Sequence, residues 1–104
     1  MTELVLLYIP VPDQECGLSL ARELVGAKLA ACANLLAPGT SVYEWEGTLC
    51  ESTEQFLLLK TTPEHADACQ QQVLNSHPYN CPCVLRLPAH ANPAFGEWVS
   101  EQLR

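Results

Sequence analysis

The sequence is poor in charge, and above all in positive charge. Only 16% of its 104 residues are charged, with 5 lysines and arginines against 12 aspartates and glutamates and a net charge of −7. A chain this acidic is a poor binder of the phosphate backbone, so nucleic acid is excluded as a partner. So few charged side chains also leave a monomer's surface incompletely covered, and we expect some apolar surface to be buried by a second copy.

The sequence also lacks the segments that target a chain to a membrane or across it. Its first apolar run, residues 4–9, has no basic region before it and is ended by Pro10 and Pro12. No stretch approaches the roughly 20 apolar residues that a membrane-spanning helix requires. The expectation is a cytoplasmic protein without a membrane partner.

No arrangement of catalytic residues is visible. The chain has no Gly-rich phosphate loop, and no nucleophile is accompanied by a base and an orienting group. The loop at residues 9–13 contains no thiol, which excludes the C-x-x-C motif that a metallochaperone carries after its first strand. We therefore expect a protein that is not an enzyme.

Cysteine, by contrast, is abundant, with six residues in the chain. Without a secretion signal, reduced thiols are favoured over a disulfide framework. Cys32 and Cys69 have apolar neighbours and are predicted to be buried. Only Cys81-Pro82-Cys83 forms a local pair, and its spacing differs from the C-x-x-C of zinc sites.

Apolar periodicity and the positions of proline and glycine predict one α+β domain spanning residues 1–104. The expected elements are a strand at 3–11, a helix at 14–29, a strand within 28–47 that bends at Pro38-Gly39, a turn with a short strand fragment at 47–52, a strand at 54–62, a helix from Pro63 to near His77, a strand at 84–88 and a helix from Asn92-Pro93. This β-α-β-β-α-β order, with a C-terminal helix, predicts a ferredoxin-like sandwich.

Residues 41–46 alternate in an unusual way. Tyr43 and Trp45 fall on one face of the expected strand, and Glu44 and Glu46 on the other. Neither face is simply hydrophilic or simply hydrophobic. Such a strand is typical of one that another surface partly covers.

Four phrases resemble the CutA family of divalent-cation tolerance proteins, and the similarity runs from about residue 4 to the last helix. They are Lys28-Leu-Ala-Ala-Cys-Ala-Asn34, Ser41-Val-Tyr-Glu-Trp-Glu-Gly47, Leu59-Lys-Thr-Thr62 and His77-Pro-Tyr79. The resemblance implies a ferredoxin-like subunit in a homotrimer similar in plan to the PII signalling proteins. It also implies that the hairpin carrying Tyr43, Trp45 and Glu46 reaches neighbouring subunits, so we expect these three residues at the trimer interface.

The same resemblance implies binding of copper or another divalent cation. The pattern proposed for bacterial relatives combines a cysteine late in the first strand, a glutamate opening the third and a histidine beside Pro-Tyr. These positions correspond to Ile9, Glu54 and His77, and isoleucine cannot coordinate a metal. Cys81 and Cys83 supply soft ligands near His77, so the predicted metal ligands are His77, Glu54, Cys81 and Cys83.

Several alternatives stay open at this stage. His77 is a candidate ligand, a candidate acid or base, or the residue that ends the preceding helix. Lys60 either lies in a cleft between subunits, where Tyr79 would join it, or faces water at a strand end. A trimer with such a cleft would bind or signal through a small ligand, as PII-like proteins do. A scaffold that anchors another protein would have the same sequence pattern.

Overall fold

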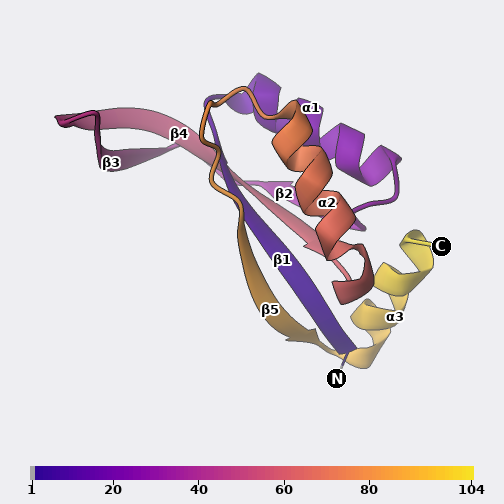
Figure 1. The fold of residues 1–104 in the computed structure, drawn as a ribbon. Coiled ribbons are helices and arrows are strands. Elements are labelled where there is room, and N and C mark those ends of the chain that lie inside the picture. The colour runs from indigo at the N-terminus through magenta and orange to yellow at the C-terminus, as the bar shows by residue number, and fades with distance from the viewer. Residues whose placement is uncertain (1) are drawn as a thin grey trace.

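The computed structural model describes residues 2–104, so Met1, which the expected domain includes, lies outside the described residues. The elements are β1 (Thr2–Val11), α1 (Gln14–Gly26), β2 (Cys32–Leu35), β3 (Gly39–Trp45), β4 (Thr48–Thr61), α2 (Pro63–Ser76), β5 (Leu85–Ala91) and α3 (Pro93–Gln102). Figure 1 shows their arrangement. Within residues 2–104, none of the helices has the length and apolar character that crossing a membrane would need.

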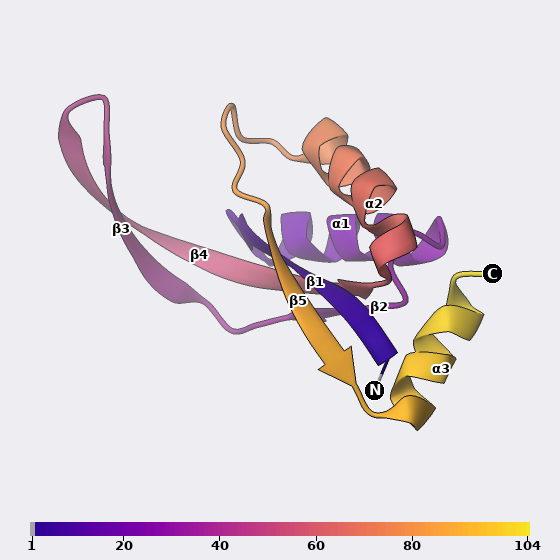
Figure 2. The same cartoon turned by 60° about the horizontal axis from the view of Figure 1, so that its bottom comes forward.

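One antiparallel sheet organises the chain, with strands in the order β2-β4-β1-β5. The strand β3 pairs with the N-terminal half of β4, beyond the part that β2 occupies. Helices α1 and α2 lie together on one face of the sheet, while α3 sits at its far end (Figure 2). This is the ferredoxin-like arrangement with a C-terminal helix that the sequence predicts.

The core lies between the sheet and the helices α1 and α2. Alternate residues of β1 and β4 point toward these helices, as the two-residue period of a strand requires. Each such side chain contributes about 1.5–3 kcal/mol when fully buried. The fully or almost fully buried members are Leu7, Ile9, Val11, Leu20, Leu24, Ala30, Leu57, Leu59, Cys69 and Val73.

The opposite face of the sheet is only partly covered. Its residues follow from the strand register, which pairs Leu6 with Leu87 and Tyr8 with Leu85. The helix α3 buries only one end of this face, in a cluster around Leu4 and Val99. Leu85 and Leu87 remain 52% and 45% exposed. The incompletely covered apolar surface expected from composition is therefore present.

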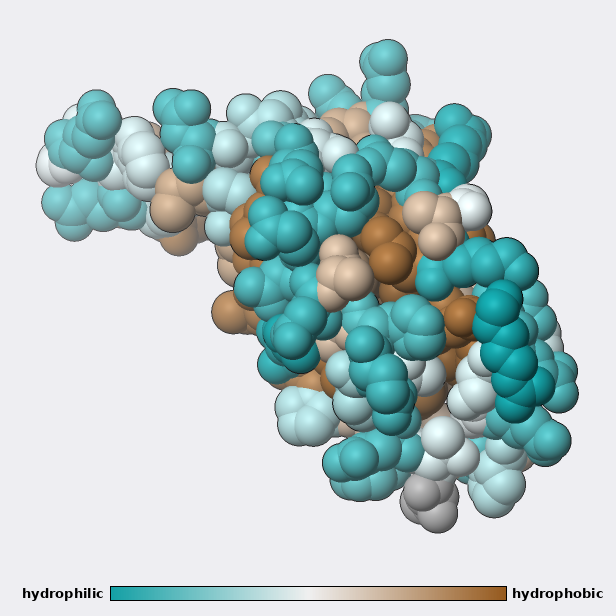
Figure 3. Space-filling model, turned by 45° about the vertical axis from the view of Figure 1, so that its right-hand side comes forward, coloured by the Kyte–Doolittle hydropathy of each residue, from teal (hydrophilic) through white to brown (hydrophobic). Residues whose placement is uncertain are grey.

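We call β3 and the residues of β4 that pair with it, 48–54, the arm. Its turn at Glu46-Gly47 has φ angles of 50° and 80°, the two left-handed residues that a tight I′ hairpin turn needs. The arm extends from the body, and the molecule measures 45 × 23 × 22 Å (Figure 1). In Figure 3 its end is mostly hydrophilic, while hydrophobic residues reach the surface nearer its base.

Three element boundaries differ from those expected. The strand fragment at 47–52 and the strand at 54–62 are one continuous strand, β4, because pairing with β3 carries the ladder through the polar stretch. The first helix ends at Gly26 rather than at 29, since Lys28 takes a left-handed conformation with φ 59°. The strand β5 continues past Pro88 to Ala91, which an edge strand tolerates.

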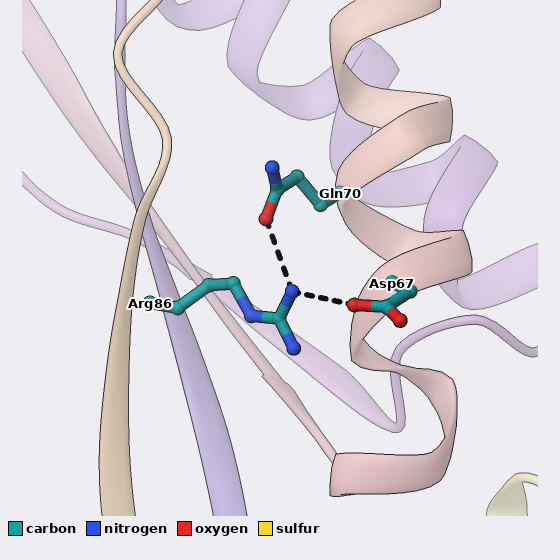
Figure 4. Close-up of polar contacts among 3 residues, drawn as sticks. All are labelled: Asp67, Gln70 and Arg86. Atoms are coloured by element: carbon teal, nitrogen blue, oxygen red, sulfur yellow. Dashed lines mark hydrogen bonds and ion pairs between the residues drawn. The ribbon is translucent and has the colours of Figure 1, made fainter.

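A polar contact ties this edge strand to the helical layer. The guanidinium of Arg86 on β5 lies 2.7 Å from the carboxylate of Asp67 and 3.3 Å from the side-chain oxygen of Gln70, both on α2 (Figure 4). Asp67 is almost fully exposed, so the ion pair itself contributes only about 0–1 kcal/mol. Its effect is to orient β5 against α2.

Candidate functional site

A hollow of about 730 Å³ lies beside the arm and reaches from Glu54 at its base to Trp45 next to its turn. This volume falls within the range of small-molecule sites, and most of the hollow's lining side chains are proline, aromatic or cysteine. They come from the end of β1, from both strands of the arm and from the loop at 78–83. The lining residues are Pro10, Pro12, Tyr43, Trp45, Cys50, Ser52, Thr53, Glu54, Pro78, Tyr79, Asn80, Cys81 and Cys83.

The strand β4 supplies one side of the hollow through its alternation. Cys50, Ser52 and Glu54 share a face because successive side chains of a strand point in opposite directions. Tyr43 pairs with Cys50 across the arm, and its hydroxyl lies 3.3 Å from that of Ser52. The arm therefore presents a thiol, hydroxyls and a carboxylate toward the loop.

His77 fixes the start of the loop, and both of its ring nitrogens are engaged. Its Nδ1 accepts a hydrogen bond from the backbone N–H of Tyr79 at 3.2 Å, so the ring proton is on Nε2. Nε2 then donates to the carbonyl of Pro10 at 2.9 Å. The side chain is buried, with its ring edge against Tyr79. His77 thus joins the loop to the end of β1.

Tyr79 carries this connection on to β4. Its phenol donates a 2.7 Å hydrogen bond to Oε2 of Glu54, and a carboxylate acceptor makes such a bond stronger than one between neutral groups. Burial, this hydrogen bond and the charge of Glu54 all raise the pKa of Tyr79. The phenol therefore stays protonated and remains a donor.

Cys81 and Cys83 are exposed at the same hollow. Partial burial is the main cause that raises the pKa of Cys83, and the negative charge of Glu54 and the neighbouring Cys81 raise it further. The two thiols and the carboxylate therefore act on one another electrostatically. In the absence of a cation, the Cys83 thiol is protonated at neutral pH.

The predicted metal ligands do not converge as they stand. Nowhere in the stretch from Thr2 to Arg104 do three or more histidine, cysteine, aspartate or glutamate side chains lie close enough to hold a metal ion. Glu54 is joined to Tyr79, and His77 has no free nitrogen. Ile9 is fully buried in the core. The copper pattern of bacterial relatives therefore does not fit the donors that this chain offers at those three positions.

The two residues of the predicted cleft lie apart within one chain. Lys60 is six residues along β4 from Glu54, or about 20 Å at 3.3 Å per strand residue. Its ammonium lies 5.5 Å from the ring centre of Phe95 on α3. Tyr79 is at the hollow instead. Lys60 and Tyr79 would share a cleft only if different subunits supplied them.

The predicted interface residues all lie on the arm. Tyr43 and Trp45 are 43% and 49% exposed, which is high for aromatic side chains. Glu46 is exposed at the hairpin turn. Tyr43 and Trp45 also line the hollow, so a neighbouring subunit that covered them would border it.

Cys50 is one of the lining residues that the sequence did not predict. The sequence predicts a turn with a short strand fragment at 47–52, and this interpretation does not show the alternation that places Cys50 in line with Ser52 and Glu54. Reading 48–54 as a strand paired with 39–45 would have revealed it, because the Glu46-Gly47 pair suits a two-residue hairpin.

Comparisons with known proteins agree on one family. The family model described as CutA1 divalent ion tolerance protein matches residues 5–102. Among curated relatives, Protein CutA homolog of Xenopus laevis is 39% identical over 95 residues, covering 90% of this chain and 63% of that protein. Divalent-cation tolerance protein CutA of Citrobacter koseri is 38% identical over 103 residues, covering 98% and 90%.

Other relatives differ in length and compartment. Protein CutA 1, chloroplastic, of Oryza sativa is 36% identical over 101 residues, covering 96% of this chain and 57% of its own. The chain thus spans less than two thirds of the frog and rice relatives. The rice relative is named as chloroplastic and an Archaeoglobus fulgidus relative as periplasmic, so the compartment varies within the family.

Solved structures share the fold over most of their length. The crystal structure of divalent ion tolerance protein CutA1 from Ehrlichia chaffeensis aligns with a TM-score of 0.94 and 33% identity, covering 100% of this chain and 98% of that one. Family model, relatives and structure all cover the elements that form the hollow. The chain therefore belongs to the CutA1 divalent ion tolerance protein family.

Proposed function

We propose that the protein is a homotrimer that binds copper or another divalent cation at the hollow, with Cys81, Cys83 and Glu54 as ligands. The observation that carries this proposal is that two exposed thiols and a carboxylate line the same hollow, although they do not converge on one point without a movement of the loop. A cation there would offset the mutual repulsion of these groups when they ionise.

His77 has a different part in this proposal from the one that the family pattern suggests. It could bind a metal only by giving up its hydrogen bond to Pro10 or to Tyr79. Breaking either bond would leave a buried polar group without its partner. We therefore assign His77 the task of holding the loop, so that Cys81 and Cys83 stay beside Glu54.

Metal uptake tests the proposal directly. Equilibrium dialysis of the reduced protein against Cu(II) and Zn(II) should show at least one bound ion per chain. Uptake should be lost in a Cys81→Ser, Cys83→Ser variant and reduced in Glu54→Gln. Cys16→Ser, which alters a cysteine outside the hollow, serves as the control. Equal uptake by the wild type and the double variant would show that the loop cysteines do not bind the metal.

The homotrimer is supported by two exposed apolar surfaces. One is the arm, whose Val42, Tyr43, Trp45 and Leu49 are all exposed. The other is the open face of the sheet around Leu85 and Leu87. If the arm of one subunit packed against a neighbour, both surfaces could be covered at once. Native mass spectrometry should show a single species of three chains, and a monomer at micromolar concentration would contradict it.

A reducing compartment such as the cytoplasm suits the described cysteines. All six are free, and two of them are exposed as thiols. Exposed thiols a single residue apart would be vulnerable to oxidation outside such a compartment.

A small organic ligand is the second candidate, and the shape of the hollow favours it. A volume of about 730 Å³ is far larger than one ion needs, and Trp45 and Tyr79 offer aromatic walls. A thermal-shift screen of metabolites, with and without a chelator, separates the two candidates. Stabilisation that persists in chelator would indicate the organic ligand.

A further inference from the structure

Cys81 and Cys83 are the only two of the six cysteines that are close in the sequence, and they are also the exposed ones. Of the other four, three are half-buried and Cys69 lies in the core. Both members of the pair line the hollow. A thiol reagent in solution therefore reaches these two side chains before the others.

The backbone around the pair can bring the two sulfur atoms together. Two residues span at most about 7 Å when fully extended, and a disulfide needs a Cα separation of roughly 4.4–6.8 Å. The pair lies between the end of α2 at Ser76 and the start of β5 at Leu85, so no strand ladder holds it extended. Pro82 between the two cysteines fixes its φ near about −65°, a value that suits a turn.

The chain is held on both sides of the pair. Upstream, the phenol of Tyr79 is hydrogen-bonded to Glu54. Downstream, Leu85 pairs with Tyr8 of β1. A disulfide within the loop closes a small ring between these two anchors. The sheet and the core can accept it without repacking.

Cys50 is the third thiol at the hollow, but it is poorly placed for a disulfide with the loop. It is half-buried on β4, directly across from Tyr43 in the hairpin ladder. Its Sγ lies 3.5 Å from the carbonyl oxygen of Thr48. Cys50 could move toward the loop only together with the arm, whereas the loop pair can close without the movement of any strand.

We propose that Cys81 and Cys83 are a reversible dithiol that exchanges with low-molecular-weight disulfides of the glutathione type. One loop thiolate attacks the small disulfide, which forms a mixed disulfide and releases one reduced thiol. The second loop thiolate then attacks the protein sulfur of the mixed disulfide, which closes the Cys81–Cys83 bond and releases the second thiol. The protons of the two loop thiols pass to the two released thiolates. The protein loses two electrons, and the small disulfide gains them.

The surroundings of the pair suit a transient exchange rather than a permanent bond. The hollow has a volume of about 730 Å³, within the range that holds small organic ligands, so the mixed disulfide has room. An exposed disulfide that closes so short a ring is easily reduced, as is typical of regulatory disulfides. The pair would be open in a reducing compartment and would close when the ratio of disulfide to thiol rises.

No metal takes part in this exchange, which therefore goes beyond the proposed function and does not depend on it. The two are nevertheless connected, because they use the same two thiols. Closing the disulfide would remove Cys81 and Cys83 as ligands of any cation.

Mass spectrometry of the intact, reduced protein after incubation with oxidised glutathione tests the proposal. The incubation contains a chelator and is done at about pH 8, where a fraction of thiols is ionised. The wild type should lose two free thiols and retain no glutathione. Cys81→Ser and Cys83→Ser should each stop at an adduct of one glutathione, because the second loop thiol is missing. An excess of reduced glutathione should restore all thiols.

Cys50→Ser and Cys16→Ser are the controls and should both behave as the wild type does. Circular dichroism checks that each variant is folded. A wild type that keeps all its thiols, or that retains glutathione as the two loop variants do, would overturn the proposal. A Cys50→Ser variant that stops at an adduct would also overturn it, because Cys50 would then be the closing thiol. Metal uptake in dialysis is a separate measurement, so either proposal can fail without the other.

Discussion

The phenol of Tyr79 donates a 2.7 Å hydrogen bond to the carboxylate of Glu54, and this one contact joins the loop after α2 to the long strand β4. Together with the two hydrogen bonds of His77, it forms a continuous connection from Pro10 at the end of β1 to the base of the arm. The hollow owes its shape to this connection.

Removing the Tyr79 hydroxyl should loosen the hollow. We expect Tyr79→Phe to lower the free energy of unfolding by about 1–2 kcal/mol, because it deletes a hydrogen bond to a charged acceptor. Urea denaturation measures the change. Tyr43→Phe is the matched control, because its hydroxyl makes only a longer, exposed contact with Ser52. Tyr43→Phe should lower the free energy of unfolding by less than about 0.5 kcal/mol. Equal losses in both variants would contradict the assigned role of Tyr79.

Replacing His77 should release the loop. His77→Ala leaves the carbonyl of Pro10 and the N–H of Tyr79 without their partner, at a cost of about 1–3 kcal/mol. Hydrogen exchange at residues 79–83 should become faster while exchange in α1 stays slow. The control is His90→Ala, at an exposed position on β5, which should leave the exchange rates of the loop and of α1 unchanged. Unchanged exchange in the loop of His77→Ala would show that the prolines alone hold it.

Two glycine variants should change stability in opposite directions. A Cβ atom on Gly96 would overlap the side chain of Thr2, where α3 packs against β1. Gly96→Ala should therefore cost about 1–3 kcal/mol. Gly26 has open space around its Cα and ordinary helical geometry, so Gly26→Ala should gain about 0.5–1 kcal/mol. Thermal unfolding of the two variants measures both changes. A stabilised Gly96→Ala would mean that α3 packs less closely against β1 than described.

Truncating Trp45 should weaken assembly. The indole is 49% exposed on the arm, so its loss should matter little to an isolated subunit but much to a contact with another subunit. We expect Trp45→Ala to shift the proposed trimer toward smaller species in native mass spectrometry, with a lower Tm. Trp98→Ala, which removes a similarly exposed indole on α3, controls for the loss of aromatic surface. An intact trimer with an unchanged Tm would show that Trp45 does not contribute to the interface.

Stability should fall in alkaline solution because of Cys69. Burial raises the pKa of this thiol from 9.0 to about 11, although the charge of Arg86 lowers it slightly. The folded state thus favours the protonated thiol. The resulting stabilisation is complete below pH 9 and is lost as pH rises through 11. Urea denaturation at several pH values between 8 and 11 should show the decline. The free energy of unfolding of Cys69→Ala should fall less steeply with pH than that of the wild type. Equal slopes in the two proteins would show that other groups cause the decline.

The sequence predicted the body of the fold well, because its signals there are local. The apolar run of β1 and the Thr62-Pro63 start of α2 need no knowledge of the rest of the chain. β4 was divided in two because residues 48–53 are mostly polar and join a strand only through pairing with β3. That tertiary contact outweighed local propensity.

The candidate site was predictable in its residue types but not in their connections. Glu54 was singled out from the family resemblance, and Cys81 and Cys83 as soft ligands near His77; all three line one hollow. The partner of His77 Nε2 is the carbonyl of Pro10, 67 residues away, so no local pattern contains this contact. Cys50 was missed for the same reason as the outer half of β4.

The continuity of β4 limits how the arm can change in length. This strand pairs with β1 and β2 in the body and with β3 in the arm, without a break between them. Because side chains alternate, inserting or deleting one residue near position 53 would turn every arm residue to the opposite side. Homologous chains should therefore lengthen or shorten the hairpin by two residues per strand, in both strands together. An odd change would require a bulge to restore the facing of Tyr43 and Trp45.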